Sequence, residues 1–289
     1  MAKDKNTAVS LGSVGERIRA LLLSPIRVFQ AVCFSIGFGF LLTVFGFSLY
    51  VYFFYRSLPE IEKMDFGKLK NQAELSVFYK LEDKKQPHHW VDLKDVSRDF
   101  IYAIVMSEDS AFFDHSGVDF DAIMNSLAEN IRKKKYEYGG STISQQVAKN
   151  VFLKNEKKLT RKAKELLLTS RIEGRFNKNQ ILEIYLNIAE FGRDLFGISE
   201  AAKFYFNKKP TEINAAEGVF IALMLPSPRK YQYALFENKN LPEAKRRRVR
   251  RVLGDMLANE LISAKQYHQY TKYDFFRFSR GSGEKLTTD

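Results

Sequence analysis

The feature that most constrains this chain is an uncharged run near its start. Residues 28–55 read VFQAVCFSIGFGFLLTVFGFSLYVYFFY, which is 28 consecutive residues without Asp, Glu, Lys or Arg. As an α-helix this run would be about 42 Å long, enough to cross a hydrocarbon core of about 30 Å. It is too long for the apolar part of a signal peptide, and no small-residue cleavage site follows it. The sequence therefore predicts one transmembrane helix rather than a buried core helix or a cleaved leader.

The charges beside the run predict its orientation. Residues 1–27 carry five Lys or Arg against two acidic residues. Basic residues concentrate on the cytoplasmic side of a membrane span, and aromatic residues such as Tyr50, Tyr52 and Tyr55 gather at its interfaces. We expect a single-pass protein of the inner (cytoplasmic) membrane, with the N-terminal segment 1–27 in the cytoplasm and the rest of the chain in the periplasm.

The remainder divides into a connector, one domain and a tail. The connector, residues 56–92, is polar and contains SVFY at 76–79, which we interpret as a short strand. From residue 93 onward, apolar residues recur every three or four positions, as is typical of amphipathic helices. We expect a mainly α domain over 93–270, a size that one core supports, followed by a tail over 271–289. The clearest later helical segments are 159–176, 178–191, 197–206, 214–224 and 242–259.

Composition narrows the kinds of site and partner. The chain has one cysteine and four histidines, which excludes an intrachain disulfide framework and Cys-rich metal sites and leaves little for a His-based one. Its net charge of +12 points toward a polyanionic partner: nucleic acid, an anionic membrane or a phosphorylated substrate. Charge alone does not choose among them.

Acidic and aromatic residues gather at 108–119, EDSAFFDHSGVD, directly after an apolar segment. If Glu108 lies near Phe112 and Phe113, its carboxylate loses water, its pKa rises and it suits the role of a general base. Taken alone, the cluster is more typical of a solvated helix end, with His115 as a structural hydrogen-bonding residue.

Two further segments carry polar chemistry. Residues 139–150, GGSTISQQVAKN, predict a tight turn and a capped helix start, whose free N–H groups can bind a phosphate or sugar oxygen. Residues 154–165, KNEKKLTRKAKE, place several cations on the same helix face as Glu165. The residues of the first segment are also typical of an ordinary helix cap, and those of the second are also typical of a solvated helix face. Outside a membrane, however, lipid-linked phosphate is a better anionic partner than nucleic acid.

In order and spacing, these segments resemble glycosyltransferase family 51, the peptidoglycan glycosyltransferases that polymerise lipid II. The matching patterns are ED-x-x-F-x-x-H-x-G at 108–117, GGST-I-x-QQ at 139–146, RK-x-x-E at 161–165, K-x-x-IL-E-x-YLN at 178–187 and R-x-x-x-GI-x-x-AA-x-x-YF at 193–206. Five matches in the family's order make the resemblance specific.

The resemblance implies a mainly α, lysozyme-like domain with two lobes, the smaller of which touches the membrane. It also implies the reaction. A general base removes the proton of the acceptor's GlcNAc 4-hydroxyl, which attacks C1 of the donor's MurNAc with inversion to form a β-1,4 link. The leaving undecaprenyl pyrophosphate is an anion that needs cations rather than a protonating acid. The implied partners are lipid II, the growing glycan strand and membrane lipids, with other cell-wall synthesis proteins as candidates and no nucleic acid.

Position by position, the resemblance assigns two catalytic carboxylates, Glu108 as the general base and Glu165. Glu165 would orient the substrate or hold a divalent cation, Mg²⁺ or Mn²⁺, near the pyrophosphate, and no covalently bound cofactor is expected. The candidate substrate-binding residues are Asp109, Phe112, His115, Ser141, Thr142, Gln145, Gln146, Lys149, Lys157, Arg161, Lys162, Lys164 and Arg193.

A few positions depart from the family pattern. Ser144 replaces the commoner Thr, and Asp194 and Asn207 replace glycines. Lys157 stands where an Arg often contacts the donor, and its assignment is weaker because Lys lacks the two-pronged hydrogen bonding of Arg. We still expect an active enzyme, and one without a transpeptidase domain, for which the remaining chain has no room.

Three other functions remain open. A lytic transglycosylase or muramidase shares the implied fold, although hydrolases need a protonating acid and give the cationic cluster no role. A non-catalytic, membrane-anchored scaffold of cell-wall synthesis would not need both carboxylates. A nucleic-acid binder would require the domain to lie in the cytoplasm.

Overall fold

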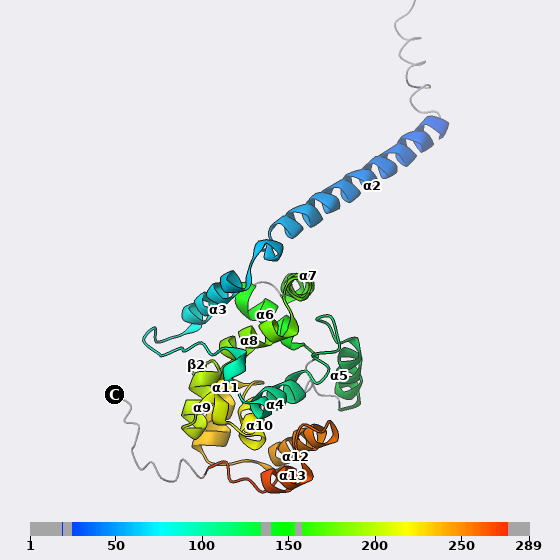
Figure 1. Ribbon diagram of the computed structural model, residues 1–289. Helices are drawn as coiled ribbons and strands as arrows, with labels where there is room; N and C mark the ends of the chain where they lie inside the picture. Colours follow the sequence, from blue (N-terminus) through cyan, green and yellow to red (C-terminus); the bar gives the residue numbers. More distant parts are fainter. Residues whose placement is uncertain (1–18, 20–24, 134–139, 154–157, 277–289) are drawn as a thin grey trace, which may run out of the picture. The chain divides into compact units, whose positions relative to one another are not determined.

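The computed structural model describes residues 19, 25–133, 140–153 and 158–276 (Figure 1). They form two units, one that ends at Leu58 and one that begins at Pro59. The helices are α2 Pro25–Arg56, α3 Phe66–Lys80, α4 Arg98–Glu108, α5 Phe120–Lys133, α6 Ile143–Phe152, α7 Lys158–Arg175, α8 Lys178–Ile188, α9 Ile198–Phe206, α10 Ala215–Ala222, α11 Pro228–Tyr231, α12 Glu243–Ala258 and α13 Ala264–Tyr270, with two strands, β1 Glu190–Gly192 and β2 Leu195–Phe196, and short helical turns at Ile61–Lys63, Leu93–Asp95, Pro210–Glu212 and Gln232–Glu237.

The first unit contains α2, which covers the predicted apolar run. Within the described part of the chain, α2 is the helix that is long and apolar enough to cross a membrane, and its most apolar stretch has a mean hydropathy of 2.1. None of its residues is buried by protein. An apolar helix without protein cover satisfies its own backbone hydrogen bonds and fits a lipid environment.

The strand predicted at 76–79 is wrong, because these residues belong to α3. Asp65 caps this helix by accepting a hydrogen bond from the Lys68 N–H at 2.8 Å. Its buried apolar residues Leu69, Ala73 and Val77 recur every fourth position and face α6 and α8. This packing outweighs the local β preference of Val, Phe and Tyr. Helix α3 is therefore packed against the helical domain.

The second unit is built around α10, every residue of which is buried. It packs against α4, and α12 covers both helices. Gly218 allows the close approach, since a Cβ there would lie 2.8 Å from the Cβ of Ala103. This packing fixes α4 and with it the position of Glu108, the last residue of α4.

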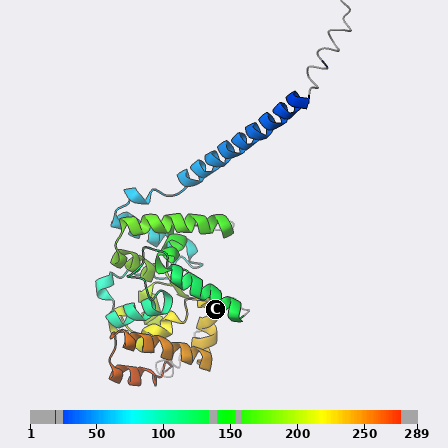
Figure 2. The ribbon, with the colours of Figure 1, turned by 90° about the vertical axis from the view of Figure 1, so that its right-hand side faces the viewer.

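A second group of helices, α6, α7 and α8, packs together with α6 between the other two. Figures 1 and 2 show α7 at one end of the second unit and α12 with α13 at the other. The unit is mainly α, as predicted, and the later helical segments begin and end close to their expected positions. The segment expected over 178–191 is shorter, because the chain leaves α8 at Ile188 and enters β1.

The two positions at which Asp and Asn replace the family's glycines have positive φ angles, 55° at Asp194 and 51° at Asn207. Glycine adopts this left-handed region most easily, and Asp and Asn tolerate it better than other residues do. Asp194 also accepts hydrogen bonds from the N–H groups of Glu82 and Asp83, at 2.9 and 3.1 Å. Both departures from the family pattern are therefore compatible with the backbone.

Candidate active site

Glu108 lies at the C-terminal end of α4, and its side chain is only 13% exposed. Gln146 of α6 donates from Nε2 to Oε2 of Glu108 at 3.2 Å, and Nη2 of Arg248 on α12 lies 3.9 Å from the other carboxylate oxygen. Burial raises the pKa of Glu108, while Gln146, Arg248 and Lys149 oppose the rise. Glu108 is therefore a largely buried carboxylate rather than a solvated helix end, and such a group suits a general base.

Arg248 gives a prediction about pH. Its positive charge lowers the pKa of Glu108, so Arg248→Gln should raise that pKa further. A base acts in its deprotonated form, and activity is lost as pH falls through its pKa. The acidic limb of the profile of kcat/KM against pH should therefore move to higher pH in the variant. Arg250→Gln is the matched control, because Arg250 lies on the same helix and pairs with Glu243. If the acidic limb of kcat/KM were at the same pH in Arg248→Gln as in wild type, Arg248 would not lower the pKa of the catalytic base.

Asp109 links the loop after α4 to the start of α6 through hydrogen bonds. Its carboxylate is 2% exposed and accepts from His115 Nε2 and from the Ile143 N–H, both at 2.9 Å. The Gly117 N–H donates to His115 Nδ1 at 3.0 Å, so Nε2 carries the proton that His115 donates to Asp109. Both oxygens of Asp109 are used within the protein. Asp109 and His115 therefore position the loop beside Glu108.

This network predicts a loss of stability in Asp109→Asn. Both partners of Asp109 are donors, so the NH₂ group of the new amide must face one of them. Losing a buried hydrogen bond to a charged group should lower the free energy of unfolding by about 2 kcal/mol, measured by thermal denaturation followed by circular dichroism. Asp114→Asn, at an exposed position in the same loop, is the control. Equal melting temperatures for the two variants would show that the network contributes little.

The predicted residues at the start of α6 mainly hold that helix in place. Thr142 and Gln145 are buried and form a capping box, and the Thr142 hydroxyl donates to the Gly117 carbonyl at 2.6 Å. Phe112 is fully buried. Ser141 is exposed, and its hydroxyl accepts from Lys162 Nζ at 3.4 Å. Of this group, Ser141 is the one that faces both solvent and the cations of α7.

The second predicted carboxylate, Glu165, lies on α7 with its side chain 6% exposed and forms a close ion pair with Lys162. Lys149 of α6 interacts electrostatically with both Glu165 and Glu108. Burial lowers the pKa of Lys149, the positive charges of Arg161 and Lys162 lower it further, and the negative charges of Glu165 and Glu108 oppose this. Lys149 is therefore within electrostatic reach of both carboxylates. The structure brings together the two carboxylates and three of the predicted cations.

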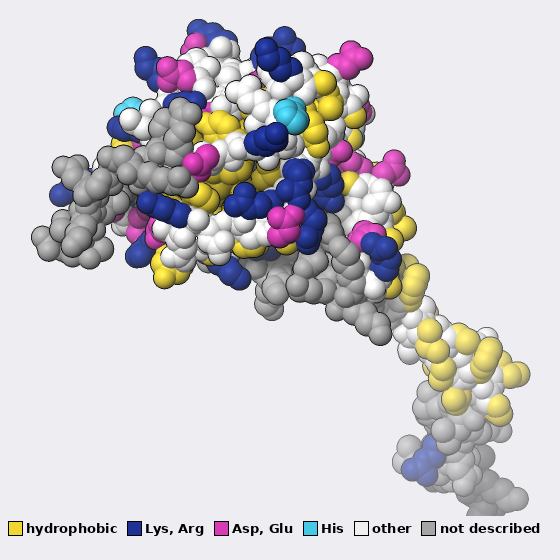
Figure 3. Space-filling model, turned by 90° about the horizontal axis from the view of Figure 1, so that it is seen from below, with side chains coloured by type: hydrophobic (Ala, Val, Ile, Leu, Met, Phe, Trp, Pro, Cys, Tyr) yellow, Lys and Arg dark blue, Asp and Glu magenta, His cyan; other side chains and the backbone are white. Residues whose placement is uncertain are grey.

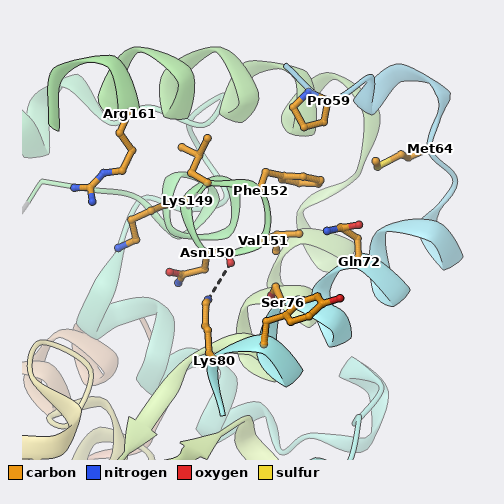
Figure 4. A pocket seen from close by; sticks show the side chains of 12 residues that line it. Pro59, Met64, Gln72, Ser76, Lys80, Lys149, Asn150, Val151, Phe152 and Arg161 are labelled. Carbon is orange, nitrogen blue, oxygen red and sulfur yellow. Dashed lines mark hydrogen bonds between the residues drawn. The ribbon is translucent and has the colours of Figure 1, made fainter. Parts of the chain in front are cut away.

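Two cavities lie beside these groups. The larger has a volume of about 990 Å³ between α3, α6 and α7 and combines an apolar wall with basic side chains (Figure 4). Arg161 lines it, and the buried Arg161 Nε has no hydrogen-bond acceptor among the described residues. The smaller, of about 130 Å³, is lined by Glu108, Asp109, Ser141 and Thr142 together with neighbouring residues. Anionic groups fit the larger cavity, and a proton acceptor faces the smaller one.

Other predicted residues are not placed at these cavities. Arg193 lies in the turn between β1 and β2, where its guanidinium is 3.6 Å from Glu82, and it lines neither cavity. Lys164 lies on α7 and lines neither. Lys157 falls outside the described residues.

Three residues near the site were missed by the sequence analysis. Lys80 lines the larger cavity, and Arg248 lies near Glu108. The Tyr185 hydroxyl is buried, and burial together with the negative charges of Glu108 and Asp109 raises its pKa well above the usual range. Tyr185 falls inside a recognised motif but has the spacing of a core residue. Lys80 and Arg248 reach the site from α3 and α12, and their sequence surroundings carry no signal of it.

The metal prediction can be tested against the donor set around Glu165. In the part of the chain that the structure describes, no group of three or more His, Cys, Asp or Glu residues could hold a metal ion. One oxygen of Glu165 is also paired with Lys162. The described side chains thus form no metal site by themselves. Mg²⁺, however, is often bound by one or two carboxylates together with substrate phosphates, and Glu165 fits that pattern.

Comparisons with known proteins identify the family of the chain. The family model described as transglycosylase matches residues 74–257, from within α3 to within α12. A biosynthetic peptidoglycan transglycosylase of Acinetobacter baumannii is 36% identical over 167 residues, which cover 56% of this chain and 74% of that protein. Proteins of the same name from Azoarcus sp. and Janthinobacterium sp. are 43% identical over 150 residues and 40% identical over 159 residues. They cover 52% and 55% of this chain, and 65% and 69% of their own lengths.

Proposed function

Because the chain belongs to the transglycosylase family, we propose that it polymerises lipid II into β-1,4-linked glycan strands and releases undecaprenyl pyrophosphate. The observation that carries the proposal is the pairing of a desolvated carboxylate, Glu108, with a cluster of cations beside an apolar cavity. A lipid pyrophosphate has the same two parts, a charged group and an apolar chain. Cleavage of preformed glycan would give the cations no such ligand.

The proposed step is a displacement at the anomeric carbon. Glu108 takes the proton of the acceptor's 4-hydroxyl while its oxygen forms a bond to C1 of the donor sugar. The bond between C1 and the pyrophosphate oxygen breaks, and its electron pair leaves with the pyrophosphate. Lys149 and Arg161 stabilise the charge that develops on this leaving group. The Gln146 amide and Arg248 hold the carboxylate of Glu108 in position.

A divalent ion enters the proposal only together with the substrate. Glu165 would hold Mg²⁺ or Mn²⁺ jointly with phosphate oxygens, where the ion would neutralise part of the pyrophosphate charge. The chain's own contribution at this position is the ion pair between the buried Glu165 and the half-exposed Lys162, whose ammonium also donates to Ser141.

The membrane part of the proposal rests on two apolar surfaces, α2 and one face of α5. Phe120, Met124, Leu127 and Ile131 of α5 follow helical spacing and are each at least 50% exposed. Figure 3, which views the second unit from the end that carries α12 and α13, shows Lys and Arg side chains beside hydrophobic ones on that face. Apolar groups flanked by cations suit an anionic membrane surface. We propose that α2 anchors the chain in the inner membrane and that the domain acts at its outer side.

The proposed function is tested by incubating the full chain in detergent with labelled lipid II and separating the products on a gel. Polymer that muramidase degrades is the expected result. Shortening of added glycan strands without polymer formation would favour the lytic alternative. Binding of lipid II or of other cell-wall synthesis proteins without any reaction would favour the scaffold.

A further inference from the structure

Helix α3 contributes one basic side chain to the larger cavity. Lys80 is its last residue, and its ammonium donates to the Asn150 carbonyl at 2.9 Å. Figure 4 shows Lys80, Lys149 and Arg161, from α3, α6 and α7, reaching toward the same side of the cavity. Phe152, Pro59 and other apolar groups lie on the remaining wall. Three cations from three separate helices thus converge on one space.

Lys80 has no acidic partner in the part of the chain that the structure describes. Among the described residues, no carboxylate forms an ion pair with it, although the negative charge of Glu190 acts on it from a distance. The Lys80 side chain is exposed and its hydrogen bond to Asn150 lies near the surface, so its ammonium is only partly buried. This burial and the positive charge of Lys149 lower the pKa of Lys80 to about 8. Three cations at one cavity, of which Lys80 has no ion-paired carboxylate among the described residues, favour an anionic ligand.

We propose that Lys80 is a third cation of the pyrophosphate-binding site, a substrate-binding residue supplied by α3; this inference rests on the proposed function. An ammonium group has three N–H donors, and the Asn150 carbonyl uses one of them, which leaves two for phosphate oxygens. The buried Arg161 Nε, which lacks an acceptor among the described residues, is a further donor at the same cavity. The pyrophosphate would be held between α3, α6 and α7, with its chain along the apolar wall.

A purely structural role for Lys80 makes a different prediction. Asn150 lies in the last turn of α6, where carbonyl groups lack helical partners, so Lys80 also caps this helix. If capping were its whole role, Lys80→Met would lower stability and leave the folded protein's affinity for pyrophosphate unchanged. Lys80→Arg keeps a positive donor at this position and should preserve both roles.

Proton uptake on ligand binding distinguishes a pyrophosphate-binding role of Lys80 from a role in capping α6 alone. The charged groups around Lys80 are Lys149 on α6, Arg161 on α7 and Glu190 on β1, and the titratable but neutral Tyr79 precedes it on its own helix. At pH 8.8, above its pKa of about 8, Lys80 is mostly neutral in the free protein, and a bound pyrophosphate raises its pKa. Ligand binding at pH 8.8 should therefore take up most of one proton at Lys80, and affinity should fall as pH rises above 8. Lys149 also takes up protons when the ligand binds, in every variant that retains it. The number of protons taken up at Lys80 is therefore the proton uptake of wild type minus that of Lys80→Arg.

The experiment is calorimetric titration of the full chain in detergent with farnesyl pyrophosphate, at pH 8.8, in buffers of different ionisation enthalpy. We expect Lys80→Met to weaken binding about tenfold or more. Lys80→Arg should bind as tightly as wild type or more tightly, with less proton uptake. Lys68→Met, at an exposed position of the same helix, is the control and should match wild type.

Wild-type affinity in Lys80→Met, or unchanged proton uptake in Lys80→Arg, would overturn the assignment, as would the absence of farnesyl pyrophosphate binding to wild type. Lipid II polymerisation is measured separately on the same samples. Lys80-dependent binding without polymer from wild type would support the site while the proposed function fails. Polymer from wild type and from Lys80→Met with equal KM would overturn the role of Lys80 alone.

Discussion

Replacing Glu108 by Gln is expected to reduce the rate of glycan polymerisation by about 10²–10⁴-fold, the usual contribution of a general base. The amide has nearly the same shape and can still accept a hydrogen bond from Gln146, but it cannot take the proton of the acceptor hydroxyl. The loss should therefore appear in kcat. It is measured with labelled lipid II at saturating concentration.

Stability provides an internal control for Glu108→Gln. Burial raises the pKa of Glu108, so above the unfolded-state pKa, at neutral pH, the folded protein carries an ionised group that its surroundings disfavour. The neutral amide should leave the melting temperature equal to that of wild type or raise it, as is common for catalytic groups. Glu74→Gln, at an exposed position on α3, should change neither property. Activity of Glu108→Gln within tenfold of wild type would exclude Glu108 as the base.

Replacing Lys149 by Met is the second change with a large expected effect. Lys149 lies within electrostatic reach of both Glu108 and Glu165, and its charge is expected to stabilise the leaving pyrophosphate. Removing one preorganised stabilising group of this kind typically costs about 10²–10³-fold in kcat. Lys149→Arg keeps the charge and should recover part of the rate. Initial rates are measured across a range of lipid II concentrations, which separates kcat from KM.

The control for Lys149→Met is Lys203→Met, an exposed lysine on α9. A change in KM with kcat intact would mean that Lys149 binds the ground state and the transition state equally, and that its charge does not lower the barrier. That result would contradict the role proposed for it in pyrophosphate departure. A fall in kcat with little change in KM is what the geometry predicts.

Much of the fold follows from local patterns in the sequence. The apolar run predicted α2, and recurring apolar positions predicted the later helices, because each helix buries one face. The strand predicted at 76–79 was wrong because Val77 is buried by packing against distant helices, which a local reading does not contain. The positive φ angles at Asp194 and Asn207 are ones that glycine adopts most easily, which a sequence pattern alone does not reveal. The general shape of the domain was thus predictable, and α3 was not.

The site was predictable where its residues lie inside recognisable motifs. Glu108, Lys149 and Glu165 come from three such segments, and the structure brings them together. Lys80 and Arg248 were not predictable, because α3 and α12 join the site only through tertiary packing. Lys80 follows the apolar segment 76–79, which resembles a strand, and Arg248 lies in a basic run at 245–251 that is typical of a solvated helix. The structure adds two cations from outside the motifs, Lys80 and Arg248, to those that the motifs contain.

Glycan polymerisation is tested most directly by counting two products of the wild-type reaction in one sample. Lipid II labelled in the sugar and in the pyrophosphate reports the disaccharides that enter polymer and the pyrophosphate that leaves. We predict one undecaprenyl pyrophosphate released for each disaccharide added, in a product that muramidase degrades, with both products formed at least about 10²-fold more slowly by Glu108→Gln. Polymer shortening without pyrophosphate release, or equal product formation by Glu108→Gln, would contradict the proposed reaction.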